Sequence, residues 1–231
     1  MKKEFQFKEG EVLLINKPIH WTSFQVVNKL RWLIKKKLHV KKIKVGHAGT
    51  LDPLATGLMI ICTGKKTKEI DQYQASNKEY IATIKLGATT PSYDGETVEN
   101  YFYGTKHINA DLISKTLLRF LGDSQQYPPI FSAIKIEGKK LYESARKGKE
   151  IEIKPRSIQI KELELLKIEM PYVQVRVVCS KGTYIRSLAY DLGKALNSGA
   201  WLCKLQRTKI GDYELKSALD IQAFEEEVKS S

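Results

Sequence analysis

One run near residue 50 strongly limits the local fold: Gly46-His47-Ala48-Gly49-Thr50-Leu51-Asp52-Pro53-Leu54-Ala55-Thr56-Gly57-Leu58. Glycine and proline favour turns, and the residue before a proline is pushed toward extended backbone. Asp52 therefore cannot readily lie in a helix, and we expect a loop of defined shape to present its carboxylate. The apolar run 58–62 predicts a buried strand that holds this loop in place. Taken alone, Asp52-Pro53 also fits an ordinary turn.

The charge of the chain predicts a polyanionic partner. The formal net charge is +13 over 231 residues, and each phosphate that a cation neutralises releases counterions. Between Lys29 and Lys44 there are eight Lys or Arg residues and no acidic residue, whereas three glutamates stand at 225–227. A charge that served solubility alone would be spread more evenly. The pattern favours a nucleic-acid-binding protein.

Other features exclude several classes of protein. The hydrophobic share of 42% and the charged share of 28% are typical of a soluble globular chain. No apolar stretch approaches the roughly 20 residues that span a bilayer, and the first residues lack the pattern of a secretory signal. Cys62, Cys179 and Cys203 are odd in number and lack CxxC spacing, which argues against a disulfide framework and a zinc site. We expect a cytoplasmic protein without a membrane anchor.

The periodicity of apolar residues predicts a mixture of strands and helices. A strand over 12–15 leads to Lys17 and Pro18, and Thr22 or Ser23 can cap a helix with Phe24, Val27, Leu30 and Ile34 at helical spacing. Further strands are expected over 78–86, 154–170 and 173–179, and further helices from Asn109 or Asp111 to 120, over 183–196 and over 217–228. In the strand 78–86, Tyr80 shares one face with Ala82, Ile84 and Leu86. The mixture predicts one α+β domain.

Arg186 stands out within the helix predicted after residue 182. Thr183 can cap this helix, whose apolar stripe is Ile185, Leu188, Ala189, Leu192 and Leu196. Arg186 lies off that stripe in the first turn, where the helix dipole is unfavourable for a cation. We therefore expect a compensating anion nearby, although an exposed helix arginine would also fit the pattern.

The run 46–57 resembles the catalytic motif of bacterial TruB-type tRNA pseudouridine synthases, which isomerise uridine 55 in the T loop. Four other segments are similar to motifs of that family: Lys17-Pro18, Lys78-Glu79-Tyr80, Cys179 to Arg186, and Leu202 to Thr208. The likeness extends over residues 11 to 215. Two positions depart from it: Ser92 and Tyr93 precede Asp94 where the family has Thr-x-Thr-x-Asp, and Gln206 replaces an arginine.

The resemblance implies a pseudouridine synthase fold, in which helices flank a central, mostly antiparallel sheet. It implies a single catalytic domain over 1–231, with a thumb-like insertion at about 127–150. Many relatives carry a further C-terminal RNA-binding domain of the PUA type, but we expect none in this chain. The expected substrate is the T stem-loop of tRNA. The expected enzyme is a monomer that needs no cofactor, no metal and no protein partner.

The resemblance also implies roles for individual residues. Asp52 is the catalytic carboxylate, Arg186 its ion-pair partner and Lys17 a supporting cation. Tyr80 stacks on the target base, Tyr184 contacts the sugar or the base edge, His47 fills the gap left by the flipped base, and Leu205 supplies an apolar wall. A carboxylate in a pocket without water stays ionised only with a cation close by. Whether Asp52 attacks the sugar, attacks the base or removes a proton stays open.

Two alternatives belong to other classes. The chain could be an RNA-binding protein that does not catalyse, but Asp52, Tyr80 and Arg186 are all present. It could also be an enzyme that works with a guide RNA inside a protein complex. The short chain favours an enzyme that acts alone.

Overall fold

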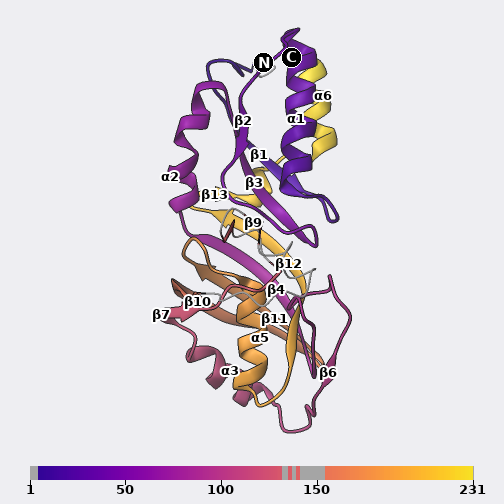
Figure 1. Cartoon of the computed structure of the whole chain (residues 1–231), viewed down its shortest axis with the longest axis vertical. Helices are drawn as coiled ribbons and strands as arrows, with labels where there is room; N and C mark the ends of the chain where they lie inside the picture. The colour runs from indigo at the N-terminus through magenta and orange to yellow at the C-terminus, as the bar shows by residue number, and fades with distance from the viewer. Residues whose placement is uncertain (1–4, 132–134, 137–138, 141–153, 231) are drawn as a thin grey trace. The chain divides into compact units, whose positions relative to one another are not determined.

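The structure is a computed structural model that describes residues 5–131, 135–136, 139–140 and 154–230. The chain forms two compact units, one of residues 1–80 with 205–231 and one of residues 81–204 (Figure 1). No linker separates them in sequence, because β4 (Lys78–Leu86) and β12 (Ala200–Ile210) each begin in one unit and end in the other. The expected single catalytic domain stays a prediction.

The first unit is built around a sheet with the order β1-β3-β12. Strand β1 (Val12–Lys17) pairs antiparallel with β3 (Ala55–Thr63), so that Lys17 lies opposite Gly57. Strand β12 pairs parallel with β3, and Leu205 lies opposite Ala55. Two short strands extend this sheet, β2 (Val45–His47) on β3 and β13 (Tyr213–Glu214) on β12. The predicted buried strand is confirmed as part of β3, whose residues 57–63 are all buried.

Helices α1 (Ser23–Leu38) and α6 (Ile221–Ser230) lie side by side in this unit (Figure 1), joined by a 2.7 Å ion pair between Lys29 and Glu225. The remaining elements are the 3₁₀ helices η1 (Gly64–Glu69) and η2 (Leu215–Ser217) and the helix α2 (Ile70–Ala75). The predicted start of the last helix at 217 is wrong. That segment forms η2, and α6 begins later because the Asp220 carboxylate accepts a hydrogen bond from the backbone of Ala223 at 2.7 Å.

Thr22 caps α1 as predicted. Its side chain accepts a hydrogen bond from the Gln25 backbone, while the Gln25 side chain accepts one from the Thr22 backbone. One apolar position was assigned to the wrong face, because Phe24 is 65% exposed. The buried face instead consists of Val26, Val27, Leu30, Leu33 and Ile34. Phe24 stands four residues before Asn28 and eight before Trp32, on the opposite stripe of the helix.

The second unit contains the strand order β12-β4-β11-β10-β7. The long strand β10 (Arg156–Glu169) pairs antiparallel with both β11 (Tyr172–Cys179) and β7 (Gly122–Gln126). The strand predicted over 78–86 is confirmed as β4, with alternate residues buried from Lys78 onward. Helices α3 (Ala110–Leu118) and α5 (Ile185–Ala195) complete the unit with short strands β5 (Ala88–Thr89), β6 (Tyr101–Phe102), β8 (Lys135–Ile136) and β9 (Lys139–Lys140).

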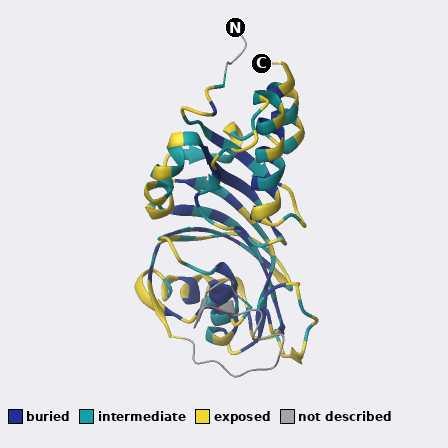
Figure 2. Ribbon diagram, turned by 45° about the horizontal axis from the view of Figure 1, so that its top comes forward, coloured by how far each residue is buried: buried dark blue, intermediate teal, exposed yellow. Residues whose placement is uncertain are grey.

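Burial follows the sheets of both units, whose strands are dark blue over long stretches in Figure 2. The α+β prediction of helices around a mostly antiparallel sheet is confirmed. Only β12 and β3 pair in parallel among the registers above. Most of the expected thumb-like insertion at about 127–150 lies outside the described residues.

Candidate active site

Asp52 lies on the loop between β2 and β3, as its position before Pro53 predicts. The start of α1 holds this loop, because the Ser23 hydroxyl accepts a 2.8 Å hydrogen bond from the Leu51 N–H and lies 3.0 Å from the Leu51 carbonyl. The Ala55 N–H closes the loop by donating to the carbonyl of Asp52 at 3.1 Å. The half-buried carboxylate is therefore presented by a fixed backbone.

Lys17 supplies a buried positive charge beside this loop. Its side chain is fully buried, and Nζ donates to the carbonyls of Pro18 at 2.9 Å, Trp21 at 2.6 Å and Pro53 at 3.4 Å. Burial lowers the pKa of Lys17 from 10.5 to about 8, against the opposing attraction of the Asp52 carboxylate. The structure thus brings the predicted supporting cation into the electrostatic range of Asp52.

Arg207 is a second buried cation at the same loop, and no role is expected for it from the sequence. Its side chain is 1% exposed. The guanidinium donates to the carbonyls of Leu58 at 2.7 Å, Gly49 at 3.1 Å and Thr50 at 3.4 Å. It thereby joins β12 to β3 and to the loop that carries Asp52. The sequence signal for it is its place in the Leu202–Thr208 motif, next to Gln206 and two residues after Leu205.

His47 and Leu205 belong to the same unit. His47 ends β2, and its Nδ1 atom is buried without a hydrogen-bond partner among the residues that the structure describes. Burial lowers the pKa of His47 below 6.5, and the charge of Arg207 lowers it further. Both effects favour the neutral imidazole. Leu205 is half-buried opposite Ala55, just after the Asp52 loop.

Tyr80 is 9% exposed and shares the buried face of β4 with Ala82, Ile84 and Leu86, as the alternation predicts. Its structural role as a packed strand tyrosine is clear, and its expected stacking on a base stays a prediction.

Arg186 lies in the second unit and is 4% exposed, so the alternative of a surface arginine is wrong. Its Nη1 atom lies 3.6 Å from the Asp94 carboxylate and donates to the carbonyls of Phe131 at 2.9 Å and Ser92 at 3.3 Å. The expected compensating anion is therefore present, and it is Asp94. The expected pairing with Asp52 involves the other unit and stays a prediction.

The loop that carries Asp94 is ordered by its own side chains. The hydroxyls of Thr90 and Ser92 donate to the Asp94 carbonyl at 2.7 and 3.2 Å, and the Asp94 carboxylate accepts from the Glu96 N–H at 2.9 Å. Serine at 92 thus supplies a hydroxyl where the family pattern has threonine. The departure noted from the sequence keeps the hydrogen-bonding chemistry of the loop.

Tyr184 stands directly before α5 and is half-buried. The buried Gln126 side chain accepts from the Tyr184 N–H at 2.8 Å and donates to its carbonyl at 3.0 Å. The predicted cap at Thr183 is wrong, because Tyr184 is the N-cap residue and the Thr183 hydroxyl donates to the Ser180 carbonyl at 3.0 Å. Gln126 therefore fixes the backbone from which Tyr184 and Arg186 extend.

The predicted residues thus fall into two groups. Lys17, His47 and Asp52 meet around Arg207 in the first unit, while Tyr184 and Arg186 stand at the start of α5 in the second.

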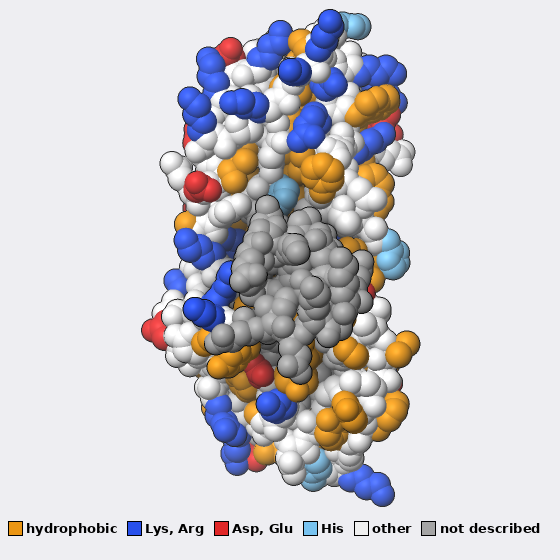
Figure 3. All heavy atoms as spheres, in the orientation of Figure 1, with side chains coloured by type: hydrophobic (Ala, Val, Ile, Leu, Met, Phe, Trp, Pro, Cys, Tyr) orange, Lys and Arg blue, Asp and Glu red, His pale blue; other side chains and the backbone are white. Residues whose placement is uncertain are grey.

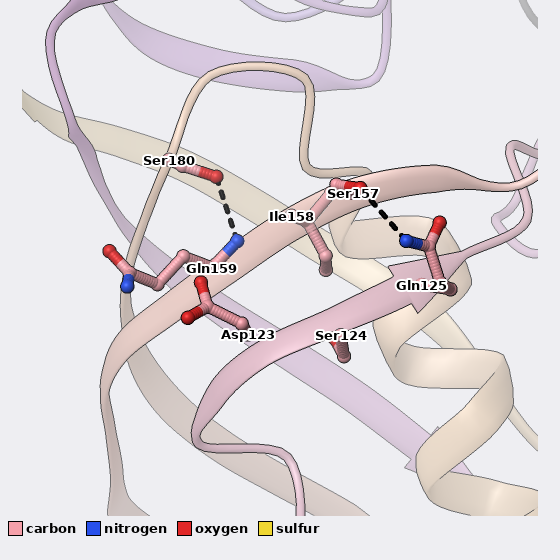
Figure 4. A pocket seen from close by; sticks show the side chains of 7 residues that line it. All are labelled: Asp123, Ser124, Gln125, Ser157, Ile158, Gln159 and Ser180. Carbon is pink, nitrogen blue, oxygen red and sulfur yellow. Dashed lines mark hydrogen bonds between the residues drawn. The ribbon is translucent and has the colours of Figure 1, made fainter.

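A separate hollow of the second unit lies along β7 and β10 (Figure 4). It is lined by one carboxylate and otherwise uncharged side chains: Asp123, Ser124, Gln125, Ser157, Ile158, Gln159 and Ser180. It contains none of the predicted site residues.

Within the described ranges, no three His, Cys, Asp or Glu side chains are grouped as metal ligands. No helix among those residues has the length and apolarity needed to cross a membrane.

Comparison with known proteins gives the family. The family model described as "TruB family pseudouridylate synthase (N terminal domain)" matches residues 35–185. Two similar proteins are named tRNA pseudouridine synthase B, from Phocaeicola vulgatus and Flavobacterium johnsoniae. Each is 58% identical, over 95% and 97% of this chain and 94% and 98% of the respective relative. The chain belongs to the TruB family. It is accordingly a pseudouridine synthase, an isomerase.

Solved structures support the same fold. The chain is similar, with a TM-score of 0.68 and 28% identity, to a chain of a Cbf5-Nop10-Gar1 complex. It is also similar, with a TM-score of 0.66 and 27% identity, to a chain of an H/ACA RNP bound to a substrate RNA containing 2'-deoxyuridine. The alignments cover 94% of this chain and 53% and 52% of those chains, so this chain spans about half their length. The predicted pseudouridine synthase fold is confirmed.

Proposed function

We propose that this TruB-family chain isomerises uridine 55 in the T loop of tRNA to pseudouridine, with Asp52 as the catalytic carboxylate. The names of its relatives support tRNA as the substrate. The observation that carries the proposal is the fixed loop of Asp52. Ser23 and Arg207 both hydrogen-bond its backbone, and Lys17 adds a fully buried positive charge beside the carboxylate.

The reaction breaks the N1–C1′ bond of uridine, turns the uracil over and joins C5 to C1′. Atoms and electrons are conserved, and the proton on C5 is released and replaced by one on N1. The step needs an anion against a sugar carbon or base carbon that becomes electron-poor. Asp52 can serve by attacking the sugar, by attacking the base or by removing a proton.

Arg186 is the proposed ion-pair partner of Asp52. The guanidinium has several donors in a planar fork, so it can hold Asp94 and also approach a second carboxylate. Within the second unit, the Asp94 carboxylate lies 3.6 Å from Nη1 of Arg186. It would orient the guanidinium and neutralise part of its charge. Lys17 and Arg207 then act as supporting and positioning cations from the first unit.

Base flipping completes the proposal. A uridine within a folded loop must leave its stack, at a cost of a few kcal/mol, and an aromatic surface returns about 1–3 kcal/mol per base. Tyr80 would provide that surface, Tyr184 would contact the sugar or the base edge, and Leu205 would form an apolar wall. His47 would fill the vacated stack, and its burial favours the neutral imidazole.

The proposed enzyme acts in the cytoplasm as a monomer, on the T stem-loop of tRNA, without cofactor, metal or protein partner. The test is incubation of the purified chain with an unmodified tRNA transcript, followed by mapping of pseudouridine. We expect product at position 55 with the native chain, and none with Asp52→Asn or with a transcript that has cytidine at 55.

Two results would contradict the proposal. Binding without product by the native chain would support an RNA-binding protein that does not catalyse. Product that appears only when a guide RNA and partner proteins are added would support the guided mode of action.

A further inference from the structure

The outer face of α1 exposes aromatic side chains that nothing in the reaction uses. Phe24 and Trp32 are 65% and 53% exposed, although the opposite face of the helix is buried in the core. Both lie on the side of the helix away from that buried face, as does the exposed Lys36. We call Phe24, Trp32, Lys35 and Lys36 the outer face of α1. Exposed aromatic residues that share one side of a helix are typical of an interaction surface.

The charge around Trp32 is positive. The Nζ atoms of Lys29 and Lys36 lie 5.2 and 5.4 Å from the centre of the Trp32 ring, within cation–π range. The last turn of α1 adds Lys35, Lys36 and Lys37. In the described part of the chain, the ion pair of Lys29 with Glu225 is the one acidic contact of the basic residues from 29 to 44. Figure 3 shows Lys and Arg side chains gathered over the upper part of the view, where the first unit lies.

The outer face begins at the catalytic loop. Ser23, the first residue of α1, hydrogen-bonds the backbone of Leu51, next to Asp52. At 1.5 Å per residue, Trp32 lies about 14 Å and Lys36 about 20 Å further along the helix axis. The outer face therefore extends about 20 Å away from the catalytic loop within the same unit.

We propose that the outer face of α1 binds the sugar-phosphate backbone of the RNA stem next to the target loop. Lys35 and Lys36 pair with phosphates, and the Trp32 ring packs against a ribose, held in place by the two flanking lysines. The inference rests on the proposed function, because the RNA must place its uridine at Asp52 for the stem to reach α1. A backbone contact would not depend on the sequence of the stem.

The test measures the affinity for an unmodified tRNA transcript as a function of KCl concentration, in chains that also carry Asp52→Asn so that no turnover occurs. Each lysine that pairs with a phosphate contributes about one to the slope of log affinity against log salt. We expect Lys35→Gln with Lys36→Gln to lower that slope by about two. Trp32→Ala should weaken binding by roughly 5-fold, since the apolar contact area that a tryptophan ring buries is worth about 1 kcal/mol.

Matched controls come from α3 of the second unit. Lys115→Gln removes a helix lysine whose side chain is 72% exposed, and Leu118→Ala removes an apolar residue that is 64% exposed. Both should leave affinity and slope unchanged. Circular dichroism of each variant verifies that α1 still forms.

An unchanged slope and affinity in the α1 variants would overturn the inference. So would a decrease in molecular mass by light scattering with Trp32→Ala at unchanged RNA affinity, which would show that the face binds a second copy of the chain. These results are distinct from failure of the proposed function, which is the absence of pseudouridine with the native chain.

Discussion

Asp52 has two buried cations in its own unit, and they act in different ways. Lys17 is a charge that interacts with the carboxylate, whereas Arg207 hydrogen-bonds the backbone that carries it. The carboxylate therefore has a fixed position and a positive surrounding before Arg186 contributes. A charged group that acts on a reacting carbon requires such preorganisation.

Arg186→Lys tests the pairing with Asp52. Lysine keeps the charge but loses the planar fork that can hold two carboxylates. We expect turnover to fall roughly 100-fold or more, as when one preorganised donor is lost, with the affinity for tRNA unchanged. Single-turnover kinetics and filter binding provide the two measurements.

The control for that substitution is Arg176→Lys. Arg176 bridges Glu162 and Glu164 at 2.6 and 2.9 Å on the surface of the same unit. The Arg176→Lys variant should keep native turnover. Native turnover in Arg186→Lys would rule out the pairing with Asp52.

Lys17 predicts a dependence of activity on pH. Its pKa of about 8 lies below the ordinary 10.5, so the side chain is charged below pH 8 and neutral above it. The positive charge beside Asp52 is then lost, and we expect kcat/KM to fall as the pH rises through about 8. A pH profile of Lys17→Met, which has no such charge, should lack this decrease near pH 8, lie below the native profile at lower pH and approach it at higher pH.

The same titration separates loss of activity from unfolding. The unfolded chain keeps the Lys17 proton up to about pH 10.5, so unfolding takes up a proton between pH 8 and 10.5. By linkage, this group makes the fold more stable as the pH rises through that window. As the pH rises from about 8 to 10.5, activity should therefore fall while the contribution of Lys17 to the free energy of unfolding increases. A parallel loss of folded protein would contradict this explanation.

At the level of elements, the junction of β3 and β12 determines where the catalytic loop ends. Arg207 lies opposite Gly57 in the parallel register, and a Cβ at Gly57 would be 2.3 Å from the Arg207 carbonyl oxygen. Gly57 also has φ of +107°, which disfavours other residues. Glycine at 57 therefore permits the close approach that lets the Arg207 side chain reach the loop.

Arg207→Lys tests this connection. Lysine keeps the charge but cannot reach the carbonyls of Gly49, Thr50 and Leu58 together. We expect kcat to fall roughly 10- to 100-fold at unchanged KM for tRNA, because a small displacement of a catalytic group is costly. The melting temperature should also fall, because a buried carbonyl without a partner costs about 1–3 kcal/mol.

An electrostatic readout distinguishes positioning from general stability. The charge of Arg207 helps to lower the pKa of His47, so Arg207→Gln should raise that pKa, measured by NMR of the imidazole, while Arg207→Lys should leave it low. A rise in KM with native kcat in Arg207→Lys would contradict the positioning role.

At the scale of the whole molecule, the elements of the fold could be predicted from local patterns. The strand 78–86 has the predicted bounds, and the stripe of α5 is buried at Ile185, Leu188, Ala189, Leu192 and Leu196. Errors arose where two local patterns compete. Phe24 is apolar but lies on the outer stripe of α1, and Thr183 can cap a helix but uses its hydroxyl one turn earlier.

The amino-acid sequence by itself determined the loop of Asp52, the alternation of β4 and the concentration of positive charge from Lys29 to Lys44, because each depends on neighbours a few residues away. Only the tertiary structure decided that Asp94 faces Arg186, that Arg207 binds the loop of Asp52 and that Trp32 is exposed. The first two are contacts between residues about 90 to 160 positions apart. The exposure of Trp32 depends on which face of α1 the rest of the unit covers. Strand pairing and burial decide these contacts and exposures, and no local sequence pattern specifies which strands pair or which faces are buried.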